Sequence, residues 1–306
     1  MHDHAPTAGT LDRTAARSRL GVSLAVNLTI VTVEIVGGII SGSLALLADS
    51  AHMLTDSIGL TLALVAATLA MRPATKKRTF GWKRAEILAA SINGLLMLGV
   101  SIFVAVEGIE RVVTPPEVDA PIMLIAAVVG LLANVVVMSL LVRHAKDSLN
   151  IRGAYLEVWG DAVGSVLVIL SGIVIMLTGF TRADGIASLI IACLIFPRAI
   201  VLLRAAVRVL LEATPEGVDV EKLRTHLSGI PGVVQIHDLH VWTITSGMPS
   251  LTVHAQIDPR YAAELSSGAM LRAFQRCTQE HFDLKHSTFQ FEIGSAVNSQ
   301  DACDAE

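Results

Sequence analysis

The chain has 306 residues, of which 53% are hydrophobic and only 16% are charged. A water-soluble globular protein would struggle to bury that much apolar surface, so the composition predicts an integral membrane protein. The formal net charge is only -4, which argues against a nucleic-acid-binding surface or a dominant acidic tail. The three cysteines lie far apart without a CxxC pair, which argues against a disulfide framework and a cysteine zinc finger.

The first segment, residues 1–19, is polar and carries arginines instead of a short apolar core followed by a small-residue cleavage signal. We therefore expect a flexible cytosolic N-terminus that is retained. His2 and His4 form a short pair that could gather metal transiently or be incidental, and Cys303 is a weaker candidate still.

Six apolar stretches follow before residue 205, each close to the length of about 20 helical residues that crosses a bilayer core about 30 Å thick. They predict a transmembrane domain over residues 20–207. The expected spans are Leu20–Ile40, Leu44–Met71, Ala85–Glu110, Pro121–Val142, Ala154–Leu177 and Asp184–Leu203.

Basic residues are concentrated in the loops after the second and fourth spans, whereas the opposite loops offer mainly Arg111 and Arg182. Because positively charged loops stay on the cytoplasmic side, this asymmetry predicts that the two loops rich in basic residues and both termini are cytoplasmic. The absence of a targeting extension and the compact loops, together with the family resemblance described below, favour a bacterial inner membrane.

After Arg208 the sequence changes to charged residues at helical spacing and to short alternating strands separated by turn signals. This sequence pattern predicts a small ferredoxin-like α+β domain with the order α-β-β-α-β over residues 208–294. A flexible tail is expected over residues 295–306. Asp219 is the expected cap of its first helix. The later elements are expected at Val233–Thr245, Ser250–Ile257, Tyr261–His281 and Ser287–Ile293.

Two pairs of ionisable side chains stand inside the apolar spans. His52 and Asp56 in the second span, and Glu157 and Asp161 in the fifth, are each four residues apart and so lie on one helix face. Because a buried ionisable group costs about 2.5–3.5 kcal/mol at the bilayer centre, the four residues need a compensating partner. One imidazole and three carboxylates suit a tetrahedral zinc-type site, and the same groups can carry protons. The sequence therefore predicts exchange of metal for protons, with His52 as the foremost proton carrier.

The same residues could instead form interhelical hydrogen bonds or an ion pair that locks the helices. Three other polar residues are candidates for accessory roles. Asp49 could support the site or serve a helix end, and Glu34 and Asn27 share a helix face that could line the same cavity or bond to a neighbouring helix.

Three motifs resemble those of the cation diffusion facilitator family. The stretch Gly42–Asp56 (GSLALLADSAHMLTD) resembles its second-span signature, Phe80–Glu86 (FGWKRAE) the start of its third span, and Ile236–Trp242 (IHDLHVW) a strand of its cytosolic domain. The likeness runs from about residue 20 to residue 293. It implies a homodimeric, six-span, proton-coupled exporter of zinc and related divalent metals, with His52, Asp56 and Asp161 in the transport site.

Glu157 departs from the zinc-type members of that family, which usually place a histidine at this position. The stretch Gly153–Asp161 (GAYLEVWGD) looks most like the cobalt-zinc-cadmium resistance branch. An extra carboxylate relaxes discrimination among divalent metals, so zinc is expected first, with cobalt and cadmium next.

The resemblance also implies a regulatory metal site in the cytosolic domain, with ligands from His237, His254 and Glu292 and with His286 nearby. His237 and His240 are three residues apart, so strand alternation predicts that they point to opposite faces of the sheet. No prosthetic group is expected, and the expected partners are a second copy, divalent metal, protons and the lipid bilayer. The alternatives are a metal-sensing membrane receptor, a passive divalent metal channel and, more remotely, an intramembrane metallohydrolase, for which the HExxH spacing is missing.

Overall fold

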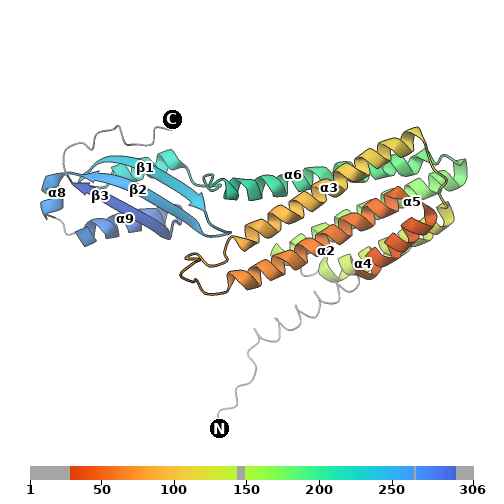
Figure 1. Cartoon of the computed structure of the whole chain (residues 1–306), viewed down its shortest axis with the longest axis horizontal. Helices are drawn as coiled ribbons and strands as arrows, with labels where there is room; N and C mark the ends of the chain where they lie inside the picture. Colours follow the sequence, from red (N-terminus) through yellow and green to blue (C-terminus); the bar gives the residue numbers. More distant parts are fainter. Residues whose placement is uncertain (1–27, 143–148, 265–266, 294–306) are drawn as a thin grey trace, which may run out of the picture. The chain divides into compact units, whose positions relative to one another are not determined.

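The computed structural model describes residues 28–142, 149–264 and 267–293. The chain divides into two compact units. The first contains residues 28–64 and 92–203, and the second contains residues 65–91 and 204–293. Figure 1 shows the long helices of the first unit and the sheet of the second.

Long apolar helices make up the first unit. Within the described ranges, five helices are long and apolar enough to cross a membrane, and a shorter apolar helix, Leu28–Ser41, precedes them. Residues 20–27 of the expected first span lie outside the described part. The five helices are α2 (Leu44–Ala70), α3 (Ala85–Val113), α4 (Ala120–Val142), α5 (Leu149–Thr178) and α6 (Arg182–Leu210).

The N-terminus of α2 is capped by a carboxylate from another helix. Asp184, in the first turn of α6, is buried and accepts hydrogen bonds from the Ser43 hydroxyl at 2.6 Å and the Leu44 backbone N–H at 2.8 Å. The Arg111 guanidinium of α3 lies 3.6 Å from the same carboxylate. Because free N–H groups and the helix dipole favour a negative charge at this end, Asp184 ties α2, α3 and α6 together.

Glycines give buried carboxyl groups room between the helices. A side chain on Gly164 of α5 would collide with the carboxylate of Asp49 on α2, which also accepts the Ser165 hydroxyl at 3.3 Å. In the same way, Gly130 of α4 leaves room for the fully buried side chain of Glu34. Small residues therefore let α2 and α5 come close enough for their polar side chains to meet.

The second unit contains a sheet that has three strands in the described ranges, in the order β1-β2-β3. Strand β1 (Val233–Thr243) runs antiparallel to β2 (Pro249–Ile257), and β2 runs parallel to β3 (His286–Ile293). Three helices accompany the sheet. They are α7 (Val220–Ser228), α8 (Pro259–Glu264) and α9 (Ser267–Phe282).

Helices α7 and α9 pack on one face of this sheet. Phe274 of α9 is fully buried and meets Phe289 and Phe291 of β3 edge-on, at centroid distances of 5.3 and 5.1 Å. Leu223 and Leu227 of α7 belong to the same core. Because side chains alternate along a strand, the other face of the sheet carries the intervening polar residues.

The sequence predicts most of this unit correctly. Asp219 caps α7 by accepting the backbone N–H groups of Glu221 and Lys222, both at 3.1 Å. The N–H of Lys222 is the main reason why the pKa of the Asp219 carboxyl lies below its usual value. The expected helix Tyr261–His281 corresponds to α8 and α9, and residues 265–266 lie outside the described part. The predicted fold class, a helical membrane protein with a small α+β domain after it, is confirmed.

The Asp184 cap predicts a loss of stability when this carboxylate is neutralised. In Asp184→Asn an amide group would face the donors of α2, at a cost of about 2 kcal/mol. We expect the thermal unfolding midpoint of the detergent-solubilised protein to fall by several degrees. Asp119→Asn is the control, because Asp119 accepts the Ile122 N–H at 3.1 Å at the exposed start of α4 and should matter much less. Equal effects of the two substitutions would contradict the role of Asp184.

The close contact at Gly164 predicts that a single added methyl group is harmful. Gly164→Ala should destabilise the protein by about 1–3 kcal/mol, because the methyl group displaces the Asp49 carboxylate. On α3, an added Cβ at Gly99 meets nothing within 4 Å. Gly99→Ala should therefore be neutral or stabilising by up to about 1 kcal/mol. If both variants unfold at the same temperature, α2 and α5 do not pack as closely as described.

Candidate metal centre

The first half of the candidate site is a pair of side chains on α2. His52 and Asp56 are separated by one helical turn and project from one face. Their Nε2 and Oδ2 atoms are 3.5 Å apart. The His52 side chain is buried, and Asp56 is half-buried.

Helix α5 supplies a third candidate ligand. Ligand atoms of His52, Asp56 and the buried Asp161 all lie within 4.8 Å of one another. In each residue one buried polar atom lacks a hydrogen-bond partner among the described residues: His52 Nδ1, Asp56 Oδ2 and Asp161 Oδ1. Buried polar atoms without partners are costly, and a cation held between these three residues would satisfy the two carboxylate oxygens. The donor set therefore fits a metal ion.

Glu157 lies beside this group of three. It stands one turn before Asp161 on α5, is half-buried, and lines the same cavity as His52 and Asp56. Its oxygens are not within 4.8 Å of all three other ligand atoms. The structure thus brings three of the four predicted residues into mutual ligand range and places the fourth in the wall of the same cavity.

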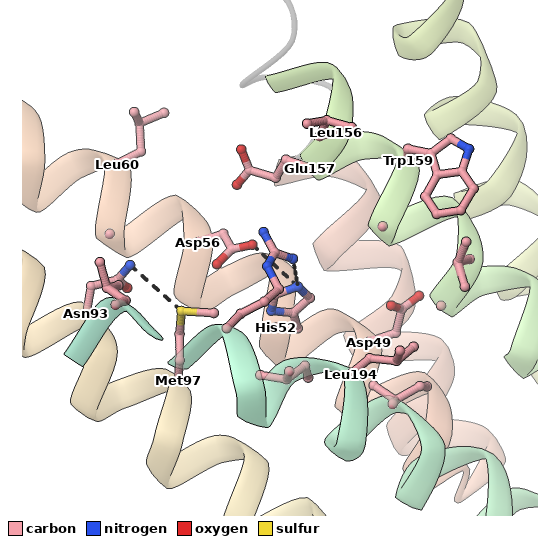
Figure 2. A pocket seen from close by; sticks show the side chains of 18 of the residues that line it. Asp49, His52, Asp56, Leu60, Asn93, Met97, Leu156, Glu157, Trp159 and Leu194 are labelled. Carbon is pink, nitrogen blue, oxygen red and sulfur yellow. Dashed lines mark hydrogen bonds and ion pairs between the residues drawn. The ribbon is translucent and has the colours of Figure 1, made fainter. Parts of the chain in front are cut away.

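The site opens into a cavity of about 750 Å³ within the helical unit (Figure 2). His52, Asp56 and Glu157 contribute polar groups, and much of the remaining wall is apolar, as at Met97 and Leu194. An apolar cavity with a few convergent polar groups is the usual form of a binding site.

The accessory candidates differ in their placement. Asp49 lines the cavity and is buried against Ser165. Glu34 is not among the described lining residues, and its two carboxylate oxygens are buried against α4 without a hydrogen-bond partner in the described part of the chain. Of its two alternatives, the structure favours contact with a neighbouring helix. Asn27 lies outside the described residues.

Two polar residues of the cavity are absent from the sequence prediction. Arg198 of α6 places Nη1 3.1 Å from His52 Nε2. Asn93 of α3 lies 4.0 Å from the Met97 sulfur through Nδ2 and has a buried Oδ1 without a partner among the residues described. The sequence alone could have indicated Arg198 as a functional residue, because a charged side chain within an apolar span is rare. Asn93 gives a weaker signal, since amides commonly join membrane helices.

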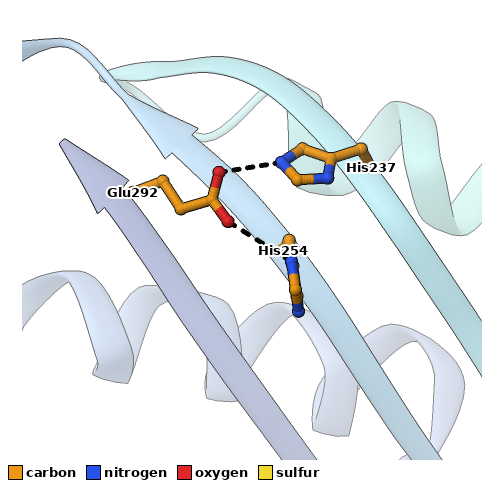
Figure 3. Close-up of side chains that lie close together, drawn as sticks. All are labelled: His237, His254 and Glu292. Carbon is orange, nitrogen blue, oxygen red and sulfur yellow. Dashed lines mark hydrogen bonds and ion pairs between the residues drawn. The ribbon is translucent and has the colours of Figure 1, made fainter. Parts of the chain in front are cut away.

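A second cluster lies on the sheet, with one residue from each strand. The His237 Nε2 atom is 3.0 Å from Glu292 Oε2, and the His254 Nδ1 atom is 3.3 Å from Glu292 Oε1. Figure 3 shows the three side chains converging. Their ligand atoms also lie within 4.8 Å of one another. Two imidazoles and a carboxylate suit zinc and similar metals.

A bulge in β1 shapes this cluster. Asp238 has a φ of 46°, in the left-handed region, and the pairing register shifts between His237 and His240. Asp238 Oδ2 lies 3.6 Å from His237 Nδ1 and 3.5 Å from His254 Nδ1. The sequence does not reveal this additional carboxylate, because a bulge depends on the pairing of β1 with β2.

The bulge also makes the prediction about His240 wrong. His237 pairs with His254 and His240 pairs with Thr252, and these partners are two residues apart on β2. Both histidines therefore point to the same face of the sheet, not to opposite faces. His240 still lies outside the described cluster of ligand atoms.

His286 lies apart from the cytosolic cluster as well. It pairs with Ser250 at the start of β3, and its ring meets Phe80 edge-on at a centroid distance of 5.6 Å. Six residues of strand, about 20 Å, separate it from Glu292. The other metal candidates, His2, His4 and Cys303, lie outside the described residues.

Known proteins match both parts of the chain. The family profile for the cation efflux transmembrane domain matches residues 20–211, and that for the cation efflux protein cytoplasmic domain matches residues 215–293. The metal cation efflux system protein CzcD of Cupriavidus metallidurans is 42% identical, over 90% of this chain and 86% of that protein. The cadmium, cobalt and zinc/H(+)-K(+) antiporter of Bacillus subtilis is 41% identical, over 85% of this chain and 84% of that protein.

Two further relatives complete the comparison. The zinc transporter ZitB of Escherichia coli is 38% identical, over 95% of this chain and 92% of that protein. The solved metal-bound C-terminal domain of the CzcD transporter from Cupriavidus metallidurans is 37% identical, covers 24% of this chain and 99% of that domain, and has a TM-score of 0.22. The family matches and the relatives at this level of identity confirm the likeness that the sequence motifs indicate. The chain belongs to the cation efflux, or cation diffusion facilitator, family.

Proposed function

We propose that the chain is a proton-coupled antiporter that exports divalent metal ions from the cytoplasm. The observation that carries the proposal is the group of His52, Asp56 and Asp161, whose ligand atoms on two apolar helices lie within 4.8 Å of one another. Ionisable residues inside a membrane mark ion pathways, because each costs about 2.5–3.5 kcal/mol even on insertion scales. A divalent cation offsets the charge of the two carboxylates and satisfies their unpartnered oxygens.

The names of the relatives support the same function. Two of them are described as efflux or antiport proteins, one of which names cadmium, cobalt and zinc, and a third is a zinc transporter. Each covers at least 85% of this chain. We assign zinc first and cobalt and cadmium next to this protein.

Glu157 supports the broader choice of metals. It lines the same cavity as His52 and Asp56, so a third carboxyl is available near the imidazole of His52. A rotation of this half-buried side chain would make it the fourth ligand of a site with one nitrogen and three oxygen donors. Oxygen-rich sites discriminate less sharply among these metals than sites with two imidazoles.

Coupling to protons follows from the chemistry of the ligands. A histidine must lose its proton to bind a metal, and a carboxyl group binds metal as the carboxylate. Metal and protons therefore compete for the same atoms, and we assign His52 as the first proton carrier. An inward proton gradient would then drive the metal outward.

The cavity supports access from the cytoplasm. It extends from His52 toward Leu60 and Ala63 on α2 and toward Leu156 on α5. The basic loop after α2 supports a cytoplasmic position for these helix ends by the positive-inside rule, and we infer that both termini lie on that side. The Asp184 cap joins three helices at the opposite end. We infer a multi-pass protein of the inner membrane whose site faces inward and releases metal after alternating access.

The cytosolic cluster is proposed as a regulatory metal site. His237, His254 and Glu292 would hold the ion, and Asp238 lies beside two of them. The boundary near residue 208 would separate this domain from the transport domain. We further propose that it helps two copies associate, which its match to a cytoplasmic dimer domain of cation efflux proteins supports.

Other functions would use only parts of this arrangement. A metal-sensing receptor would need the cytosolic cluster but not ligands within the membrane. A passive channel would conduct metal regardless of the proton gradient. An intramembrane metallohydrolase would need a catalytic base beside the metal, and the sequence lacks the HExxH pattern.

Zinc uptake into liposomes tests the proposal. The reconstituted protein is placed in liposomes that contain a metal-sensitive dye and have an acidic interior. The rate of zinc uptake should rise as the pH difference across the membrane increases, because protons leave as zinc enters. Asp161→Asn should lower the initial rate about tenfold or more, since even changes outside the ligand shell cost about 10–100-fold. Asp119→Asn, outside the cavity, should not. A rate of zinc uptake that does not depend on the pH gradient would indicate a channel. Full transport activity of Asp161→Asn would contradict the proposed transport site.

Equilibrium dialysis tests the cytosolic site. In the full chain carrying Asp161→Asn, His254→Ala should remove one bound zinc ion per chain, because two remaining ligands hold zinc poorly. His240→Ala is the matched control, since this histidine shares the sheet face but lies outside the cluster. Loss of zinc in the His240 variant, or its retention in the His254 variant, would contradict the assignment.

A further inference from the structure

Arg198 brings a permanent positive charge into the cavity. Among the described residues that line the cavity, it is the single Lys or Arg. Its Nη1 atom lies 3.1 Å from His52 Nε2. The guanidinium lines the same cavity as His52, Asp56 and Glu157. The cavity therefore already holds a cation at the site proposed for the metal.

The direction of helical side chains explains how Arg198 reaches His52. Helices α2 and α6 begin side by side, where Asp184 caps Leu44. Arg198 lies fourteen residues after Asp184, whereas His52 lies eight after Leu44, a difference of about 9 Å along the helices. Side chains tilt toward the start of their helix, so Arg198 extends back toward the site.

The surroundings of the guanidinium leave it room. A Cβ on Gly160 of α5 would lie 3.7 Å from Nη1, so the absence of a larger side chain there keeps this space open. Arg198 is exposed in the cavity rather than packed in the core. It can therefore leave His52 without unpacking the helices.

The contact with His52 involves the ring nitrogen that faces Asp56, because Nε2 lies 3.5 Å from Asp56 Oδ2. A metal ion shared by His52 and Asp56 would therefore bind this atom. A guanidinium has only donors, so in this hydrogen bond His52 must offer the lone pair of Nε2. The same lone pair is available to a metal ion only after Arg198 has moved. The charge adds a second obstacle, because a divalent cation and a guanidinium repel each other at this distance.

We propose that Arg198 is a built-in counter-cation, which occupies the metal-free site and must be displaced when metal binds. This inference rests on the proposed transport site. Arg198 offsets the charge of the carboxylates when the site is empty, and it weakens metal binding when the site is loaded. Weak binding matters to a transporter because the ion must also be released. Arg198 is thus a positioning residue that sets affinity, not a ligand.

Zinc affinity of the full chain in detergent tests this inference. The assay uses protein with His237→Ala and His254→Ala, so that only the proposed transport site is titrated. Arg198→Gln removes the charge and should tighten zinc binding about tenfold or more, with slower dissociation. Arg198→Lys keeps the charge and should bind zinc close to the original affinity. Arg182→Gln makes the same change of charge on α6 outside the cavity and should have no effect.

Each outcome has a defined meaning. Unchanged or weaker zinc binding by folded Arg198→Gln would overturn the inference, and so would a Lys variant that binds as tightly as the Gln variant. Asp161→Asn in the same assay separates this result from failure of the proposed site. If Asp161→Asn still binds zinc, the transport site itself is misplaced, whereas loss of binding leaves the Arg198 result decisive.

Discussion

Ionisable side chains that are buried between membrane helices must be compensated, and this constraint shapes the helical unit. His52 and Asp56 on α2 meet Asp161 on α5 at distances that suit a shared cation. Their unpartnered atoms would be costly in a low-dielectric setting if the site stayed empty and charged. Protons, a metal ion or the guanidinium of Arg198 can each compensate the negative charge of the carboxylates. A transporter that exchanges these occupants never leaves the carboxylates without compensation.

The packing of the helices serves this arrangement. The lack of a side chain at Gly164 admits the Asp49 carboxylate, and Gly160 leaves space beside Arg198. At one end of the bundle, Asp184 fixes the start of α2. Along the cavity, Glu157 is half-buried and Arg198 is exposed, so both side chains have room to move. The combination of a fixed end and a movable lining is what alternating access requires.

The spacing of apolar and polar residues in the sequence is sufficient to predict many of these structural features. Apolar length predicts the long helices, and four-residue spacing places His52 beside Asp56, because both features depend only on local helix geometry. Asp219 is predictable as a cap for the same reason. By contrast, the contact of Arg198 with His52 depends on how α6 packs beside α2. The shared face of His237 and His240 depends on a bulge at Asp238, which strand alternation cannot reveal.

The visible absorption spectrum of cobalt(II) bound to the full chain tests the central claim most directly. In protein carrying His237→Ala and His254→Ala, one cobalt ion per chain should give the intense bands of four-coordinate geometry, with ligands from α2 and α5. Asp161→Asn should abolish those bands because it removes one of the four ligands, the one from α5 that lies in mutual ligand range of His52 and Asp56. Unchanged bands in the Asp161 variant would contradict a metal site shared between the two helices.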